Sequence, residues 1–147
     1  MSSPELGSEQ QALVEAVQAE HAAIFGYGVV AAFADPARAE VVAEDTAAHR
    51  ARRDATAEAL RAASVDPPVA APGYTIPFPV TDPASAAQLA EQIESDTAVA
   101  WRSVVERARS ESTRTDAVGA LTEAAVRAAR WRASRGVVPS VAFPGQP

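Results

Sequence analysis

Four stretches of the chain repeat apolar residues at intervals of three, four and seven, which is the pattern of a helix with one buried face. Leu13, Val17 and Ile24, for example, follow this spacing in the first stretch. Asp35-Pro36 ends that stretch and opens the next, and Gly136 follows the last stretch as a C-terminal cap. The pattern predicts helices over residues 8–33, 36–63, 83–110 and 115–135.

The connection between the second and third helices is the longest. Residues 64–83 contain prolines at 67, 68, 72, 77, 79 and 83, so this segment cannot be helical. About 20 extended residues reach as far as a 25-residue helix is long, roughly 37 Å. Tyr74, Ile76, Phe78 and Val80 alternate with Thr and Pro, which indicates one buried face. We therefore expect a Pro-rich crossover that makes the third helix parallel to the second, as in ferritin-like bundles.

The two ends of the chain differ in character. The first seven residues are polar and rich in helix breakers, and we expect a frayed start over residues 1–7. Residues 137–147 are apolar and punctuated by proline, which predicts an extended C-terminal strap carrying Val141 and Phe143. With 147 residues, 48% hydrophobic and only 5% aromatic, the chain fits one all-α domain over residues 8–147.

Charge and cysteine content exclude several classes of function. The net charge of −6 argues against nucleic acid as a partner, because phosphate binding needs an excess of basic side chains. The chain has no cysteine, so it has no disulfide, thiol nucleophile or cysteine metal site. No long apolar run or leader pattern is present, which predicts a cytoplasmic protein with no membrane partner.

Three polar residues fall on the apolar faces of three different helices. Glu20 lies one turn from Val17, and His49 and Glu94 hold corresponding positions in the second and third helices. Arg53 follows His49 by one turn and brings a positive charge to the same face. Because buried acids need partners, we interpret Glu20, His49, Arg53 and Glu94 as a metal-free, salt-bridged cluster with no cofactor.

A metal site is the alternative interpretation of these residues. Glu20, His49 and Glu94, completed by Asp45 or Glu123, are ligands enough for one Fe, Mn or Zn ion, or for a residual di-metal centre, in an oxidoreductase or metal-binding protein. Against it, the Glu-x-x-His pairs of ferritin-like di-metal proteins are absent here. Thr46 stands where the second helix would need a Glu, and Val126 where the fourth would need a His.

Other surfaces carry weaker expectations. A small apolar ligand under the Tyr74–Phe78 segment, in a pocket near Tyr27 and Trp101, is a third possible function. On the fourth helix, Glu123, Arg127 and Arg130 repeat at spacings of four and three, which favours an exposed, ion-paired ridge. We expect an alanine-rich helix face to form a homodimer.

Several segments taken together resemble a known family. They are E-H-A-A-I-F-G-Y-G, H-R-A-R-R-D, A-A-P-G-Y-T-I-P-F-P-V, A-x-L-A-x-x-I-E and L-T-E-A-A-V-R-A-A-R-W-R. From about residue 10 to 145 the chain resembles a ferritin-like domain-of-unknown-function family of actinobacteria. The resemblance implies a four-helix ferritin-like bundle with no established activity. Within that superfamily it maps the inward acids to Glu20 and Glu94 and the inward histidine to His49. We therefore expect a ferritin-like bundle that has lost its di-metal centre and serves as a structural or binding module rather than an enzyme.

Overall fold

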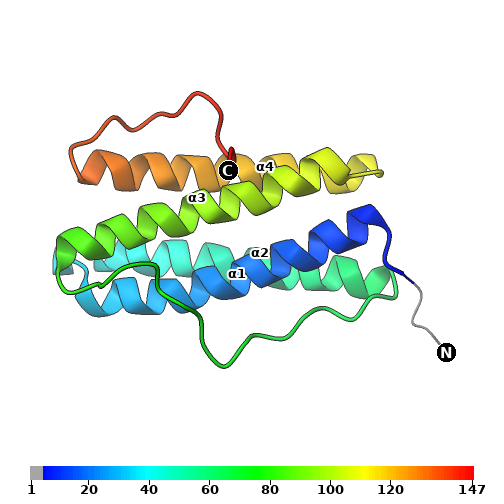
Figure 1. Cartoon of the computed structure of the whole chain (residues 1–147), viewed down its shortest axis with the longest axis horizontal. Coiled ribbons are helices and arrows are strands. Elements are labelled where there is room, and N and C mark those ends of the chain that lie inside the picture. The colour runs from blue at the N-terminus through cyan, green and yellow to red at the C-terminus, as the bar shows by residue number, and fades with distance from the viewer. Residues whose placement is uncertain (1–4) are drawn as a thin grey trace.

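The computed structural model describes residues 5–147, which form four long helices and contain no strand (Figure 1). This confirms the prediction of an all-α chain. The helices are α1 (Ser8–Phe33), α2 (Ala39–Ala62), α3 (Pro83–Arg107) and α4 (Glu111–Ser134). A 3-10 turn, η1 (Pro36–Arg38), precedes α2. Part of the predicted frayed start, residues 1–4, lies outside the described residues.

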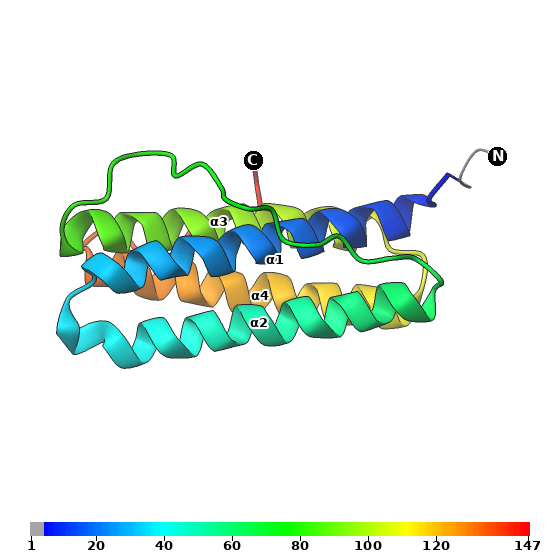
Figure 2. The ribbon, with the colours of Figure 1, turned by 90° about the horizontal axis from the view of Figure 1, so that it is seen from below.

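The four helices lie side by side with their axes roughly aligned (Figures 1 and 2). Helices α1 and α4 run in one direction, and α2 and α3 run in the other. Close backbone packing joins α1 to α2, α1 to α3, and α3 to α4. The backbones of α2 and α4 stay further apart, and long side chains bridge the space between them, for example in the ion pair of Arg52 with Glu123. Alanines at many buried positions of α3 and α4 let these two helices approach closely.

The fourth helix begins earlier than the sequence pattern predicts. The pattern predicts a start at Thr115, but the helix begins at Glu111. Ser110 acts as N-cap, because its hydroxyl accepts a hydrogen bond from the backbone N–H of Thr113. The Glu9 carboxylate of α1 accepts from the Ser110 backbone and hydroxyl as well. The polar residues 110–114, which the pattern places outside the helix, therefore form the N-cap and first turn of α4.

The other helix boundaries show smaller differences. The second predicted helix begins as η1, whose N-cap Asp35 accepts from the N–H of Ala37, before α2 takes over at Ala39. The third helix ends at Arg107, three residues before the predicted Ser110. Its start agrees with the prediction, because Asp82 and Ser85 form a reciprocal capping box around Pro83.

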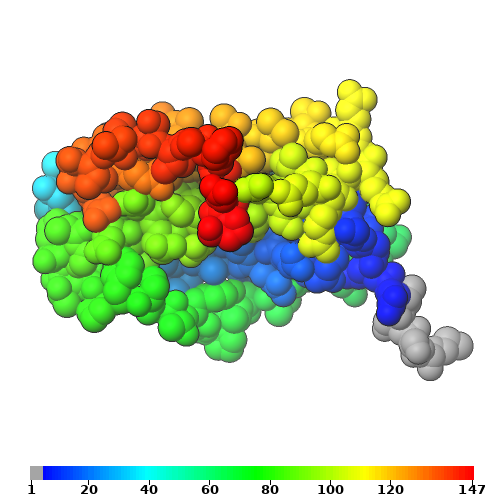
Figure 3. All heavy atoms as spheres, turned by 45° about the horizontal axis from the view of Figure 1, so that its top comes forward, coloured from blue at the N-terminus to red at the C-terminus, as the bar shows by residue number. Residues whose placement is uncertain are grey.

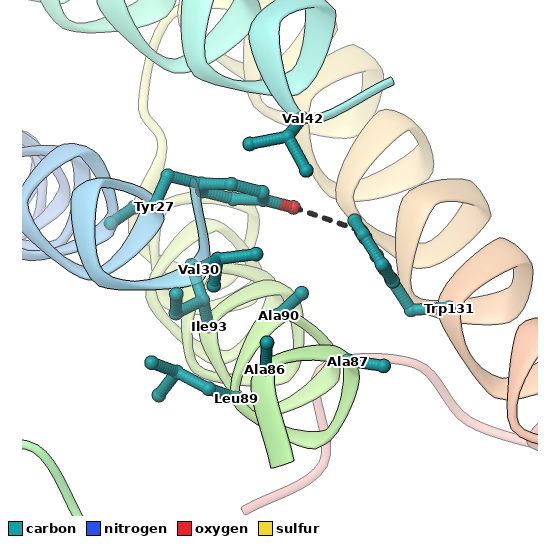
Figure 4. Close-up of a cluster of buried hydrophobic side chains, with 10 residues drawn as sticks. Tyr27, Val30, Val42, Ala86, Ala87, Leu89, Ala90, Ile93 and Trp131 are labelled. Atoms are coloured by element: carbon teal, nitrogen blue, oxygen red, sulfur yellow. Dashed lines mark hydrogen bonds between the residues drawn. The ribbon is translucent and has the colours of Figure 1, made fainter. Parts of the chain in front are cut away.

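Two clusters of apolar side chains occupy the two ends of the interior. One surrounds Tyr27 and Trp131, with Val30, Val42, Leu89 and Ile93 among its members (Figure 4). The other contains Leu13, Val17, Leu60, Trp101 and Val104. Polar side chains lie between the two clusters, and they form the site described below.

Two segments without regular secondary structure lie against the outside of the helices. Residues 63–82 run from the end of α2 back to the start of α3, alongside α1 and α3 (Figures 1 and 2). Ile76, Phe78 and Val80 of this connection pack against the apolar cluster around Tyr27. The carbonyl oxygen of Pro68 lies 3.0 Å from Nε2 of His21, which ties the connection to α1.

The C-terminal tail follows α4 back over α3 and α4 (Figure 3). The two apolar side chains of this strap stay largely at the surface, because Val141 is 46% exposed and Phe143 is 70% exposed. Gly145 is buried instead, with a positive φ of 84°. A Cβ atom there would lie 2.8 Å from the carbonyl oxygen of Ala98, so the tail docks through a residue that has no side chain. Within residues 5–147, no helix has the length and apolar character needed to cross a membrane.

Candidate functional site

Between the two apolar clusters, each helix contributes two polar or aromatic side chains to one connected group, which we call the central polar cluster. Seven of its members are buried, and the side chain of the eighth is 11% exposed. The members are Glu20 and Tyr27 from α1, Asp45 and His49 from α2, Glu94 and Trp101 from α3, and Arg127 and Trp131 from α4.

His49 lies between two carboxylates at the centre of this cluster. Its Nδ1 is 2.6 Å from Oε2 of Glu20, and its Nε2 is 2.8 Å from Oε1 of Glu94. A carboxylate oxygen only accepts hydrogen bonds, so both ring nitrogens must donate and the ring carries a positive charge. Burial opposes that charge, but the hydrogen bonds to Glu20 and Glu94 outweigh it and raise the pKa of His49 to about 9.

Both oxygens of each glutamate are used. Oε1 of Glu20 accepts a hydrogen bond of 2.8 Å from the indole N–H of Trp101, while its Oε2 is held by His49. Nε of Arg127 lies 3.0 Å from each oxygen of Glu94. Burial opposes the charge of the guanidinium, but the nearby Glu94 carboxylate stabilises it and raises the pKa of Arg127.

The hydroxyl of Tyr27 links the glutamate to a third acid. It lies 2.7 Å from Oε1 of Glu94 and 3.1 Å from Oδ2 of Asp45. A phenol has one proton, and the shorter distance assigns it to Glu94. The indole N–H of Trp131 is shared between Oδ2 of Asp45 at 3.0 Å and the Tyr27 oxygen at 3.1 Å (Figure 4).

The environment raises the pKa values of both Asp45 and Tyr27. Burial raises the pKa of Asp45, although hydrogen bonds from Trp131 and Tyr27 oppose the change. Burial and the neighbouring carboxylates of Glu94 and Asp45 raise the pKa of Tyr27 far above its usual value. Among the described residues, every buried side-chain nitrogen and oxygen has a hydrogen-bond partner.

The structure brings Glu20, His49 and Glu94 together as the sequence pattern predicts, but it places Arg53 elsewhere. The Arg53 guanidinium pairs with Asp54 at 2.9 Å, and its side chain is 29% exposed. A residue four positions after His49 is rotated by about 40° around the helix, so helical spacing alone does not decide whether it faces the cluster centre. Arg53 lines a surface cavity with His21 and Val17 instead.

Arg127 supplies to the buried acids the positive charge that the sequence pattern assigns to Arg53. We expected Arg127 on an exposed ridge with Glu123 and Arg130, and that expectation is wrong for Arg127. The sequence did carry a signal for it. The buried alanines of α4 end at Trp131, and Arg127 lies one turn before this tryptophan, so its long side chain reaches inward along the buried face.

The residues of the alternative metal site do not all meet. The Glu123 side chain is 55% exposed and pairs with Arg52 at 2.7 Å, on the outside of the helices. Thr46 uses its hydroxyl to bond the carbonyl oxygen of Val42 in its own helix. In the part of the chain that the structure describes, no group of three or more His, Asp or Glu side chains is arranged to hold a metal ion.

The three residues of the expected ligand pocket also separate. Tyr27 and Trp101 are buried, and they belong to different apolar clusters. Tyr74 lies at the surface, with its ring 5.4 Å from that of Phe25. A cavity of about 120 Å³ does lie under the connection, and Tyr74 and Ile76 line it together with residues of α1 and α3, but Tyr27 and Trp101 do not.

Comparison with known families gives a clear match. A family model described as a domain of unknown function, DUF4439, matches residues 12–147. The chain belongs to this family. The match covers α1 from Ala12 onward and all of α2, α3, α4, the connection and the tail, so the whole central polar cluster lies within the family domain.

A solved structure is also similar to this DUF4439 chain. It is the crystal structure of a conserved hypothetical protein, rv2844, from Mycobacterium tuberculosis, and it is 44% identical in sequence. The similarity covers 88% of this chain and 99% of that chain, with a TM-score of 0.85. No curated protein matches the sequence. The comparisons therefore give a family and a fold but assign no activity.

Proposed function

We propose that this DUF4439 protein is a ferritin-like bundle in which a hydrogen-bonded ionic network takes the place of a di-metal centre, and that it serves as a structural or binding module. The direction of the helices supports the ferritin-like part, because α2 and α3 run parallel and are joined by the longest connection (Figure 1). The position of the network supports the second part, because carboxylates from α1, α2 and α3 converge with His49 at the middle of the bundle.

The residues present do not fit a di-metal centre. Such a centre takes a Glu from each of two helices and a Glu-x-x-His pair from each of the other two. Here α4 sends Arg127 rather than an acid and a histidine into the middle, and Thr46 replaces the acid on α2. A guanidinium beside Glu94 opposes a second cation at the same carboxylate.

The surroundings of Glu94 are the single observation on which the proposal rests. Its two oxygens accept hydrogen bonds from Tyr27, His49 and Arg127, all within 3.0 Å. Two of these three donors are positively charged, so the carboxylate is already neutralised. A metal would have to displace them and remove a proton from His49, which opposes binding at neutral pH.

Elemental analysis tests this proposal. Protein purified without a metal-affinity column should contain much less than one Fe, Mn or Zn per chain. Its melting temperature should stay within about 1 °C when Fe(II), Mn(II) or Zn(II) is added, because an ion that does not bind cannot stabilise the fold. Near-stoichiometric metal that is lost in Glu20→Gln would instead favour the metal-binding alternative.

The cavity under the connection supports a second candidate function. Its volume of about 120 Å³ and its lining of Phe25, Tyr74, Ile76 and Ile93 suit a small apolar molecule. An apolar cavity on the order of 150 Å³ accepts benzene. Native mass spectrometry of freshly purified protein should then show a bound small molecule, and Ala23→Phe, which fills the space, should remove it.

We also propose that the protein forms a homodimer. The outward face of α4 carries Val118 and Val126, which are 47% and 44% exposed, and uncharged Thr122 lies between them. Light scattering should give twice the mass of one chain, and Val126→Glu should shift the protein toward monomer. A monomer mass for the unchanged protein at high concentration would contradict the dimer.

A further inference from the structure

We infer that Arg127 is the resident cation of the central polar cluster and that it keeps divalent metal ions out of this site. The inference rests on the proposed function, because it names the residue that makes the cluster metal-free. Nε of Arg127 contacts both oxygens of Glu94 at 3.0 Å, and the side chain is 11% exposed. The guanidinium therefore occupies the side of Glu94 that faces α4.

Helix α4 contributes a cation and no acid to the central polar cluster. Helices α1, α2 and α3 supply Glu20, Asp45 and Glu94 to the cluster. The nearest acid of α4 in this region, Glu123, turns outward to Arg52. Arg127 is consequently the only charged side chain that α4 sends to the middle of the bundle, and it balances an acid contributed by another helix.

Arg127 and His49 oppose a metal ion in different ways. His49 can lose its proton and become a ligand, so its opposition fades as the pH rises. Arg127 stays protonated at any pH at which the protein folds, and a guanidinium has no lone pair to offer a metal. A divalent ion on Glu94 would also lie close to this positive charge in a buried environment, where repulsion between like charges is strong.

Removal of the guanidinium alone should turn the central polar cluster from a site that excludes divalent metal ions into one that binds them. Arg127→Met keeps much of the length and the apolar part of the side chain but leaves the cluster one positive charge short. Oε1 of Glu94 and Nε2 of His49, which lie 2.8 Å apart, are then donors that Zn(II), Mn(II) and Co(II) accept, while Glu20 stays on Nδ1 at the opposite edge of the ring. A divalent ion would replace the lost charge as His49 gives up its proton.

Arg127→Met and Arg130→Met provide a matched test. Arg130 lies on the same helix and is exposed, so its replacement changes the net charge equally without entering the cluster. Each protein is incubated with Zn(II), Mn(II) or Co(II), desalted and analysed for bound metal. Arg127→Met should retain about one ion per chain, and its melting temperature should rise by roughly 5–10 °C with free metal about 100-fold above Kd. The unchanged protein and Arg130→Met should show neither effect.

A second substitution locates the ion. Glu94→Gln in the Arg127→Met background should abolish metal retention, because it removes a charged ligand from the cluster. Retention that persists in this double variant would place the ion elsewhere and overturn the inference. If Arg127→Met does not fold in metal-free buffer, refolding with and without Zn(II) replaces the first measurement. A resident cation predicts rescue by the ion, and failure of rescue contradicts it.

The outcomes separate the inference from the proposed function. If neither the unchanged protein nor Arg127→Met binds metal, the role of Arg127 as a barrier to metal ions is wrong, but the metal-free module stands. If the unchanged protein binds metal at its central polar cluster, the proposed function fails, and the inference fails with it. Metal binding by Arg127→Met alone supports both.

Discussion

The ends of the bundle and its middle are held together by different kinds of interaction. At the ends, side chains such as Leu60, Val30 and Val104 are fully buried and make only apolar contacts. In the middle, His49 is fixed between Glu20 and Glu94 at 2.6 and 2.8 Å. Apolar contacts depend little on direction and tolerate changes of shape, whereas buried charges need partners in one geometry. The ends therefore supply burial, while the middle sets the relative positions of the helices.

Loss of the negative charge of Glu94 should destabilise the middle of the bundle the most. Glu94→Gln keeps the shape but leaves the charged groups of His49 and Arg127 close together without a carboxylate between them. We expect the free energy of unfolding to fall by about 3–5 kcal/mol, as when one partner of a buried ion pair is lost. Urea unfolding at pH 7 measures the change.

Glu123→Gln is the matched control for that experiment. It removes the same charge from an ion pair whose glutamate is 55% exposed. Because solvent screens such pairs, the expected loss is below about 1 kcal/mol. Equal losses for the two variants would mean that burial of the central polar cluster adds nothing to its stability.

An apolar end is tested by Leu60→Ala. Leu60 is completely buried, and its truncation should lower the free energy of unfolding by about 2–5 kcal/mol through lost burial and the cavity left behind. Since no charge is involved, we expect the same loss at pH 6 and pH 9. A loss that depends on pH would show that the ends and the middle are energetically coupled.

The pH dependence of stability should come from the middle alone. The pKa of His49 is about 9 in the folded protein and 6.5 in the absence of its partners. A raised folded pKa gives stability that is complete below pH 6.5 and is lost as the pH rises through 9. The difference corresponds to about 3 kcal/mol. Urea unfolding at pH 6 and pH 10 should therefore show a decrease of this size.

Two histidine variants show which residue causes the decrease in stability between pH 6 and pH 10. His49→Gln should remove most of the pH dependence between pH 6 and pH 10, because Glu20 and Glu94 then face a neutral group. His21→Gln, which changes the only other histidine, should keep it. The raised pKa of Asp45 acts in the same direction but over a lower range of pH, starting from its ordinary value of 3.8. A decrease that survives in His49→Gln would show that the charge of His49 does not control stability.

Tyr27 belongs to both regions, the apolar end and the polar middle. Its ring packs in the apolar cluster around Trp131 (Figure 4), while its hydroxyl bonds Glu94 and lies near Asp45. Tyr27→Phe removes only the hydroxyl, and we expect a loss of about 1–3 kcal/mol, the usual effect of leaving buried polar groups unpaired. A thermal melt and urea unfolding measure it. No loss would mean that Asp45 and Glu94 are fully satisfied by their other partners.

Local signals made much of the fold predictable. The apolar spacing predicted the first helix with its observed ends, and Asp82-Pro83 marked the start of α3. Glu20, His49 and Glu94 were found because each polar residue interrupts an apolar face of its own helix. Such signals depend only on residues within a few turns of one another, so they can be read without knowledge of the tertiary structure.

The remaining features depended on contacts between distant segments. The early start of α4 at Glu111 is stabilised partly by Glu9, about 100 residues away. The choice of Arg127 over Arg53 depends on which side of each helix faces the centre, and helical spacing alone leaves both within reach. The tail likewise docks through Gly145, because its fit against Ala98 depends on the shape of a groove between α3 and α4.

The sequence by itself determined that the chain is helical, that three helices bury a polar residue, and that these residues need compensating charge. Only the tertiary structure decided which cation supplies that charge and how Tyr27, Asp45 and the two tryptophans complete the network. The physical reason is the distance along the chain over which each kind of interaction acts. Helix propensity, capping and amphipathic spacing act over a few residues, whereas the pairing of buried charges depends on the relative positions of four separate helices.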